Sequence, residues 1–220
     1  MFVVTMDQRD SRHDVDRVPE LLTALEPIET IGGFARTVGD EVQGALVSVD
    51  AVVSAVRLAL RSGYWHIGVG CGAAGDTGYF DDDDAMRSAR GPAFLRAREA
   101  VEASKKYPTS VAVVGEDAQL AADIQAFLQL LGVVVGGRTQ AQREVVELAS
   151  AGLSGQDIAR RLKISEASVS RRRSLSKVTE EEAAWPAVRR LYHHHAQLIE
   201  LAAVFCVGIS RSGIESDAEI

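Results

Sequence analysis

Apolar residues along the first 131 positions switch between two spacings, which predicts strands interleaved with helices. Strands are predicted at Phe2–Thr5, in a hairpin over Phe34–Val47, at Trp65–Gly72 and at Ser110–Val114. Helices are predicted at Val15–Leu25, Val49–Leu60, about Gly91–Lys106 and Glu116–Leu131. The order strand, helix, hairpin, helix, strand favours an α+β domain with a ferredoxin-like antiparallel sheet and helices on one face.

The hairpin carries the first candidate chemistry. Gly39 gives the turn its backbone freedom and leaves Asp40 and Glu41 at the apex. Asp7 ends the first strand, which should neighbour the hairpin strand in such a sheet, so Asp7 and Asp40 are expected to converge. Carboxylate oxygens are the ligands that Mg²⁺ prefers, so Asp7, Asp40 and Glu41 are the candidate metal ligands.

A glycine-rich strand and a following helix add to this picture. Glycines 68, 70 and 72 leave one face of the Trp65–Gly72 strand bare, which is typical of close approach by a ligand or another backbone. Gly91 and Pro92 open the next helix, whose free N–H groups suit a phosphate. We call the sheet edge at which Asp7, Asp40 and Glu41 are expected to lie the acidic corner. Arg96 and Arg98 are two positions apart on the helix, so at most one of them should face this corner. The Asp81–Asp84 run before this helix is expected to be a solvated loop.

The last third of the chain predicts an all-α unit. Gly132–Gly137 is expected to end the first domain as a short strand or linker, which sets the domains at 1–137 and 138–220. A helix is predicted at Gln140–Ala151, followed by two short helices capped by Ser154 and Ser165. The string from Asp157 to Arg171 resembles the helix-turn-helix of bacterial regulators, although Lys163 stands where the turn favours glycine. The alternative is a helical hairpin that mediates protein contacts.

The second short helix is polar and basic, as a major-groove reading helix requires. The candidate DNA-binding residues are Gln156, Ser165, Ala167, Ser168, Ser170, Arg171, Arg172 and Arg173. A long helix over Glu180–Phe205 follows, with an apolar stripe expected to form a homodimer interface or to cover the first domain. His193, His194 and His195 point about 100° apart on that helix, so they cannot share one metal ion and should be surface or interface residues.

Charge supports a division into an acidic body and a basic unit. The net charge is −7, yet residues 138–195 hold 11 Lys and Arg against 7 Asp and Glu, a balance of +4 that leaves −11 elsewhere. Two cysteines, Cys71 and Cys206, give no disulfide framework and suit a reducing compartment. The most apolar run, Leu198–Ile209, is too short to span a bilayer. A cytoplasmic protein with no membrane partner is expected.

Four blocks carry a resemblance to the SatD family and cover most of residues 1–115. They are Val4–Arg12, Thr37–Gly44, Ile67–Gly70 and Gly91–Arg98. These blocks are in turn similar to the catalytic domains of class III nucleotide cyclases and GGDEF diguanylate cyclases, a palm-like fold. The resemblance implies metal ligation by Asp7 and Asp40 with Glu41 beside them. It makes Arg12, Gly39, Gly91, Arg96 and Arg98 the candidates for nucleotide or phosphate contacts.

Departures from the cyclase pattern shape the functional prediction. Arg90 stands where the family block has an Asp, the chain contains no asparagine for the cyclase Asn-Arg pair, and the hairpin tip is not Gly-Gly-(Asp/Glu)-Glu-Phe. The sequence therefore predicts a DNA-binding transcriptional regulator that senses a nucleotide with Mg²⁺. The alternative is a metal-dependent nucleotidyl cyclase or oligonucleotide synthase that uses Asp7 and Asp40. A cyclase-like scaffold for protein contacts is the third hypothesis.

Overall fold

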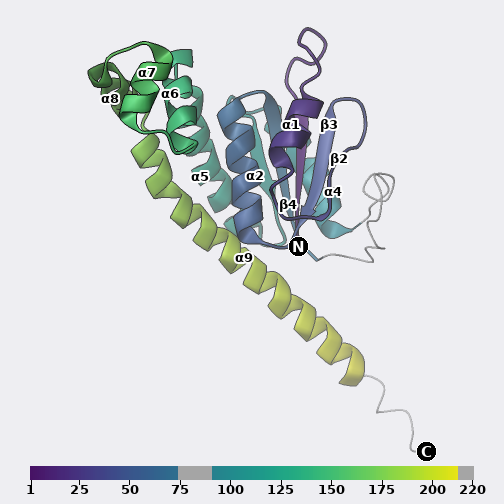
Figure 1. Ribbon diagram of the computed structural model, residues 1–220. Coiled ribbons are helices and arrows are strands. Elements are labelled where there is room, and N and C mark those ends of the chain that lie inside the picture. The colour runs from purple at the N-terminus through teal and green to yellow at the C-terminus, as the bar shows by residue number, and fades with distance from the viewer. Residues whose placement is uncertain (74–90, 213–220) are drawn as a thin grey trace, which may run out of the picture.

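The computed structural model describes residues 1–73 and 91–212, with side chains through Leu201 (Figure 1). Within these ranges the chain is mixed α/β, with eight helices and one five-stranded sheet. The Asp81–Asp84 run and Arg90 lie outside the described residues. The secondary-structure order confirms the predicted interleaving of strands and helices.

The sheet contains every strand that was predicted within residues 1–131. Its members are β1 (Phe2–Gln8), β2 (Ile31–Arg36), β3 (Glu41–Leu46), β4 (Trp65–Cys71) and β5 (Val111–Val114). Their order across the sheet is β2-β3-β1-β4-β5, with β1 antiparallel to both β3 and β4 and β2 antiparallel to β3. The fifth strand instead pairs parallel to β4, so the sheet is mixed rather than antiparallel throughout.

Helices cover both faces of the sheet, not one face as the sequence predicted. Helix α4 (Pro92–Ser104) packs on the second face, over β4. A Cβ on Gly68 would lie 2.2 Å from the backbone N of Val101, and one on Gly70 would lie 2.1 Å from the carbonyl oxygen of Ala93. The bare strand face therefore accommodates a helix backbone, which was one of the two predicted uses of these glycines.

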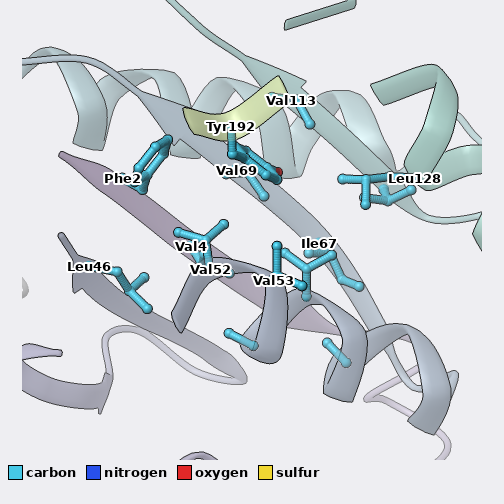
Figure 2. Packing of buried hydrophobic residues seen from close by; sticks show 14 of the residues in the cluster. Phe2, Val4, Leu46, Val52, Val53, Ile67, Val69, Val113, Leu128 and Tyr192 are labelled. Atoms are coloured by element: carbon cyan, nitrogen blue, oxygen red, sulfur yellow. The ribbon is translucent and has the colours of Figure 1, made fainter. Parts of the chain in front are cut away.

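The main core lies on the opposite face of the sheet. It is covered by α1 (Val18–Leu25), α2 (Val49–Ser62) and α5 (Ala118–Gly136), and α9 (Val178–Ser212) packs along α2 and α5 (Figure 1). Alternate residues of β1, Phe2 and Val4, point into this core with Val52 and Ile67 (Figure 2). Helix α2 begins at its Ser48 cap and ends at Gly63, whose φ of 75° is left-handed.

Helix α5 corrects the predicted boundary element. It runs through Gly136, so Gly132–Gly137 is neither a strand nor an extended linker. Gly132 lets α5 lie close to Thr109, in the segment before β5, since a Cβ on Gly132 would lie 2.9 Å from the Cβ of Thr109. In the described part of the chain, α5 alone has the length and composition of a membrane span. About a third of its most apolar window is buried, which is compatible with a soluble protein.

Three short helices with a core of their own follow α5. They are α6 (Gln140–Ser150), α7 (Gly155–Leu162) and α8 (Glu166–Leu175). Val145, Ile158, Ala159 and Val169 are buried together between them, separate from the sheet core. We refer to α6–α8 as the three-helix unit.

Helix α9 returns the chain to the body and runs without a break through Pro186. Trp185, Val188, Tyr192 and Ile199 are buried in the main core, and the Tyr192 ring meets Phe2 edge-on at 5.5 Å (Figure 2). The stripe predicted for dimerisation therefore covers the first domain, the other outcome that the sequence allowed.

The histidine prediction is wrong for one of the three residues. His193 and His194 are exposed, whereas His195 is fully buried. A Cβ on Gly115 would lie 2.1 Å from Nε2 of His195, so this glycine makes the room for the ring. Burial lowers the pKa of His195, which keeps the imidazole neutral near pH 7.

Candidate functional site

The acidic corner of the sheet is built by strand register. Asp7 on β1 is directly opposite Glu41 on β3 and His66 on β4. Side chains at opposite register positions share a face, and the alternation of β1 puts Asp7 on the α4 side with Val3 and Thr5. The structure therefore brings together Asp7 and Glu41, two of the three predicted metal ligands.

Asp40, the third candidate ligand, is not opposite Asp7 in the pairing of β1 with β3. It comes one position before Glu41, at the hairpin tip, and its carbonyl oxygen accepts the Gln8 N–H at 3.3 Å. Gly39 beside it has a φ of 61°, as the predicted turn requires. The predicted meeting of Asp7 with Asp40 is thus replaced by the cross-strand pair of Asp7 with Glu41.

Asp7 already has a cationic partner. The Nζ of Lys105, at the C-terminal end of α4, lies 2.6 Å from Asp7 Oδ2 and 2.7 Å from Glu102 Oε1. Burial alone would lower the pKa of Lys105, but its hydrogen bonds to Asp7 and Glu102 outweigh burial and raise that pKa. The charged ammonium occupies the position that a cation bound by Asp7 would take. The residues present therefore do not fit Mg²⁺ while this ion pair persists.

Glu41 and His66 complete the corner. Burial and the negative charge of Asp7 raise the pKa of Glu41, while the Thr37 hydroxyl, which donates to its Oε1, and the charges of Arg98 and Lys105 act the other way. Burial, together with the charge of Arg9, lowers the pKa of His66. Its Nδ1 is buried and has no hydrogen-bond partner among the described residues. Among the described side chains, which belong to residues 1–73 and 91–201, no three His, Cys, Asp or Glu residues are placed to hold one ion.

The predicted phosphate contacts are divided between the two ends of α4. Gly91 caps the start of α4, and Arg96 donates to the Cys71 carbonyl at 2.9 Å, at the end of β4. The acidic corner lies at the other end of α4, about 20 Å away, which is the length of a 13-residue helix. Arg98 is the one of the two arginines that acts on Glu41. Arg12 is exposed in the turn after β1.

The three-helix unit carries the second candidate site. Ser154 accepts the Asp157 N–H and Ser165 accepts the Ser168 N–H, so both predicted caps begin their helices. Lys163 ends α7 with φ 53° and ψ 45°, the left-handed turn that usually favours glycine. Ile164 then packs against the small core, so α7 and α8 meet across a tight, three-residue turn.

The predicted DNA contacts are accessible. Gln156, Ser165, Ala167, Ser170, Arg171 and Arg173 are exposed, and Ser168 and Arg172 are half-buried. Ala167, Ser170, Arg171 and Ser174 follow helical spacing along the outer face of α8, opposite the buried Val169. Residues 155–175 contain six Lys and Arg against two Asp and Glu. This face presents small polar side chains between cationic ones.

A buried ionic cluster, which was not predicted from the sequence, joins the three-helix unit to the body. Glu181 of α9 is 1% exposed and accepts from Arg61 of α2 at 2.9 Å, from Arg138 at 2.6 Å and from the Trp185 indole at 3.1 Å. Arg138 also donates to the Ser176 carbonyl at 2.8 Å, at the end of α8. Three consecutive glutamates at a helix start resemble a solvated face, and nothing local distinguishes the buried one.

Comparisons of this chain with protein-family models, with curated proteins and with solved structures find no match.

Proposed function

We propose that this chain is a DNA-binding regulator. In this proposal α7, the turn at Lys163 and α8 form a helix-turn-helix, and α8 enters the major groove. The observation that carries the proposal is the outer face of α8, where Ala167 and Ser170 stand at base-edge positions and Arg171 at its end can neutralise phosphate. Small side chains let a helix lie deep in the groove, while the six nearby cationic residues supply sequence-independent attraction.

The body is proposed to have a ferredoxin-like, cyclase-similar fold, with β5 as an addition at the edge. Support comes from the order β2-β3-β1-β4, which places β1 between the hairpin strand and β4 as that fold does. Its role would be to sense a small ligand and pass the signal to the three-helix unit through α9 and the Glu181 cluster. Such a coupling typically amounts to 1–3 kcal/mol.

DNA binding is tested by fluorescence anisotropy of a labelled duplex of random sequence in low salt. We expect the wild-type chain to bind with an affinity that falls as salt rises, because cationic side chains release counterions from DNA. Replacing Arg171, Arg172 and Arg173 by Ala should weaken binding by at least about 100-fold, in line with three lost phosphate contacts. A wild-type chain that binds no duplex at low salt would exclude the proposal.

The acidic corner supports ligand sensing as a second part of this function. Asp7, Glu41 and the neutral His66 supply acceptors, and Arg98 and Lys105 supply phosphate partners. A thermal-shift screen with each nucleoside triphosphate, with and without Mg²⁺, should show a nucleotide that raises the melting temperature. Lys105→Met should change that response, since Lys105 holds Asp7. Lys106→Met, at the exposed neighbouring position, is the control.

The alternative function is a metal-dependent nucleotidyl enzyme, which the pairing of Asp7 with Glu41 favours. The ion pair of Asp7 with Lys105 opposes it, because a catalytic metal needs that carboxylate free. Incubation with nucleoside triphosphates and Mg²⁺ or Mn²⁺ decides the question. A cyclic or oligomeric product that disappears in Asp7→Asn and Glu41→Gln would establish the enzyme in place of the sensor.

A further inference from the structure

A cleft of about 270 Å³ lies between the body and the three-helix unit. The body contributes residues from α1, from the end of α2 and from the start of β4, and α6 contributes the opposite wall. Its volume is just below the roughly 300–1,000 Å³ of clefts that hold drug-sized ligands, so it suits a small molecule. We call it the α6 cleft. It is separate from the acidic corner, since none of Asp7, Glu41 and Lys105 lines it.

The body side of the α6 cleft is rigid and partly apolar. Leu21 and Trp65 line it and are buried residues of the main core, against which Leu58 also packs. Beside them, the Arg17 guanidinium lies over the ring of Tyr64, 3.7 Å from the ring centroid. This cation–π contact keeps the two side chains in place along one wall. The apolar part of a ligand would therefore meet a surface that is already formed.

Arginine residues from three different elements line the α6 cleft. Arg17 caps the start of α1, Arg61 lies in the last turn of α2, and Arg143 lies on α6. Among the described residues, no lysine lines it. The planar fork of a guanidinium matches the paired oxygens of a carboxylate or a phosphate, which an ammonium group does not. The lining therefore indicates a ligand with such an anionic group.

Arg143 is the arginine that is available to a ligand. Arg17 and Arg61 are each held by carboxylates of their own. Arg143 is half-buried and donates from Nη2 to the Arg138 carbonyl oxygen at 2.9 Å, but in the described part of the chain no carboxylate pairs with it. A guanidinium has five N–H donors, so most of those on Arg143 remain for an anion.

The charge of the lining limits the size of the anion. Besides the three arginines, the exposed residues Glu20 and Glu147 line the α6 cleft, which leaves a balance of +1. Two carboxylates near the site would repel the clustered charges of a nucleoside triphosphate. Charge and volume together favour a compact organic anion.

The α6 cleft is connected to the buried ionic cluster that joins the three-helix unit to the body. Arg61 donates to Glu181, the carboxylate of that cluster, at 2.9 Å. Arg143 donates to the carbonyl of Arg138, whose side chain donates to Glu181. A ligand that draws on Arg143 therefore acts on the contacts that position the three-helix unit.

We propose that the α6 cleft binds a small organic anion, whose carboxylate or phosphate group is held by Arg143 and whose apolar part lies against Leu21 and Trp65. In addition, and resting on the proposed DNA-binding function, occupancy of the cleft changes the affinity for DNA. The physical reason is that the walls of the cleft belong to both the body and the three-helix unit, so a bound ligand favours one relative placement of the two.

An NMR titration of the isotope-labelled full chain, without DNA, tests the binding. The probes are benzoate, phenyl phosphate and, as the neutral control, benzyl alcohol. We expect saturable shifts of the amide signals of Ser62, Tyr64 and Gln140 with an anionic probe, with a dissociation constant of about 1 mM or lower, and none with benzyl alcohol. Signals of Asp7 and Glu41 should stay in place. Saturation by benzoate alone would assign a carboxylate ligand, and by phenyl phosphate alone a phosphate ester.

Two variants with matched controls locate the site. Arg143→Gln should raise the dissociation constant at least about 10-fold, because it removes charge-assisted hydrogen bonds, whereas Arg190→Gln, at an exposed position on α9, should not. Ala24→Phe, at an exposed position of α1 that lines the cleft, should fill it and weaken binding as strongly. Ala122→Phe, exposed on α5, is its control. Far-UV circular dichroism establishes that each variant is folded.

The absence of saturable shifts around the cleft with both anions would overturn the proposal, as would equal affinity of Arg143→Gln and wild type for the probe. The effect on DNA is measured by anisotropy at a saturating concentration of the bound probe, with ionic strength held constant by NaCl. We expect DNA affinity to change at least about 5-fold in wild type and to stay constant in Arg143→Gln. An unchanged wild-type affinity would reject the regulatory role. Because the titration contains no DNA, failure of the proposed DNA binding would leave its result unaffected.

Discussion

Individual glycines decide how the two layers of the body meet. Gly70 on β4 has no Cβ because the α4 backbone takes its place: a Cβ would lie 2.1 Å from the Ala93 carbonyl oxygen and 2.3 Å from the Ala97 nitrogen. Neither atom belongs to a flexible side chain, so the clash has no inexpensive relief. The close packing of β4 against α4 therefore requires residues without a Cβ at positions 68 and 70.

Gly70→Ala should lower the free energy of unfolding by about 3 kcal/mol, since α4 would have to lift from the sheet. Urea unfolding followed by circular dichroism measures the change. Gly136→Ala is the matched control, because nothing lies within 4 Å of a Cβ there and Gly136 is in a helix. That control should be neutral or stabilising by up to about 1 kcal/mol. Equal stability of Gly70→Ala and wild type would contradict this account of the packing.

A second residue, Lys163, carries the strained backbone of the turn between α7 and α8. Its φ of 53° is left-handed, which costs a residue with a Cβ roughly 1–2 kcal/mol. Lys163→Gly should therefore stabilise the three-helix unit by about 1 kcal/mol, whereas Lys163→Ala should not. Thermal unfolding of the two variants separates loss of strain from loss of charge. A Gly variant no more stable than the Ala variant would argue against strain at this turn.

Elements were predictable where a residue's neighbours along the chain decide its structure. The helix caps at Ser154 and Ser165 follow from hydrogen bonds to backbone N–H groups three residues further on, and both were found as predicted. The run Gly132–Gly137 was mistaken for a strand or linker because glycine and valine disfavour helices. In the structure Gly132 and Val135 of this run are buried against the body, and Gly132 lies close to Thr109, contacts that local sequence does not reveal.

The residues of the acidic corner were likewise predictable only in part, because their partners are distant in the sequence. Register between β1 and β3 fixes Asp7 opposite Glu41, and a shift of one residue would have fixed a different pair. The partner of Asp7 is Lys105, 98 positions away, at the end of a helix on the face that was expected to be free of helices. The sequence identified the carboxylates, but the cation beside them depends on where α4 packs.

Packing of α9 against α2 depends on Glu181, and this element contact gives a pH-dependent prediction. Burial would raise the pKa of Glu181, but hydrogen bonds from Arg61 and Arg138 outweigh burial and lower it. A depressed folded-state pKa means that the stabilisation is present above the ordinary glutamate pKa. It is lost as pH falls through the folded-state value.

Glu181→Gln should therefore lower the free energy of unfolding by about 3 kcal/mol at pH 7, because it leaves Arg138, 4% exposed, without its buried counter-charge. The gap from wild type should narrow in acid, below the ordinary glutamate pKa of 4.5. Urea unfolding at a series of pH values measures both. Glu182→Gln, an exposed neighbour that contacts Arg57 and Arg61, should cost at most about 0.5 kcal/mol. If the difference in unfolding free energy between wild type and Glu181→Gln did not change with pH, the charge of Glu181 would not be the cause of its stabilising effect.

At the scale of the whole molecule, the uneven distribution of charge should determine which side of the protein faces a polyanion such as DNA. Residues 138–195 carry +4 and the remainder −11, so under the proposed function the body should repel DNA and the three-helix unit should attract it. Long-range electrostatics should therefore present α7 and α8 to the duplex and keep the sheet away from it. The attraction should arise from a small number of phosphate contacts, and that number is measurable.

Single-charge variants count those contacts through the salt dependence of the affinity. Each cation that neutralises a phosphate contributes about one to the slope of log K against log salt. Arg171→Ala, on the outer face of α8, should lower that slope by about 1 and weaken binding to all sequences about equally. Arg190→Ala removes the same charge from an exposed position on α9 and should leave the slope unchanged. If both variants lowered the slope equally, the attraction would come from net charge alone, and α8 would lose its assignment as the reading helix.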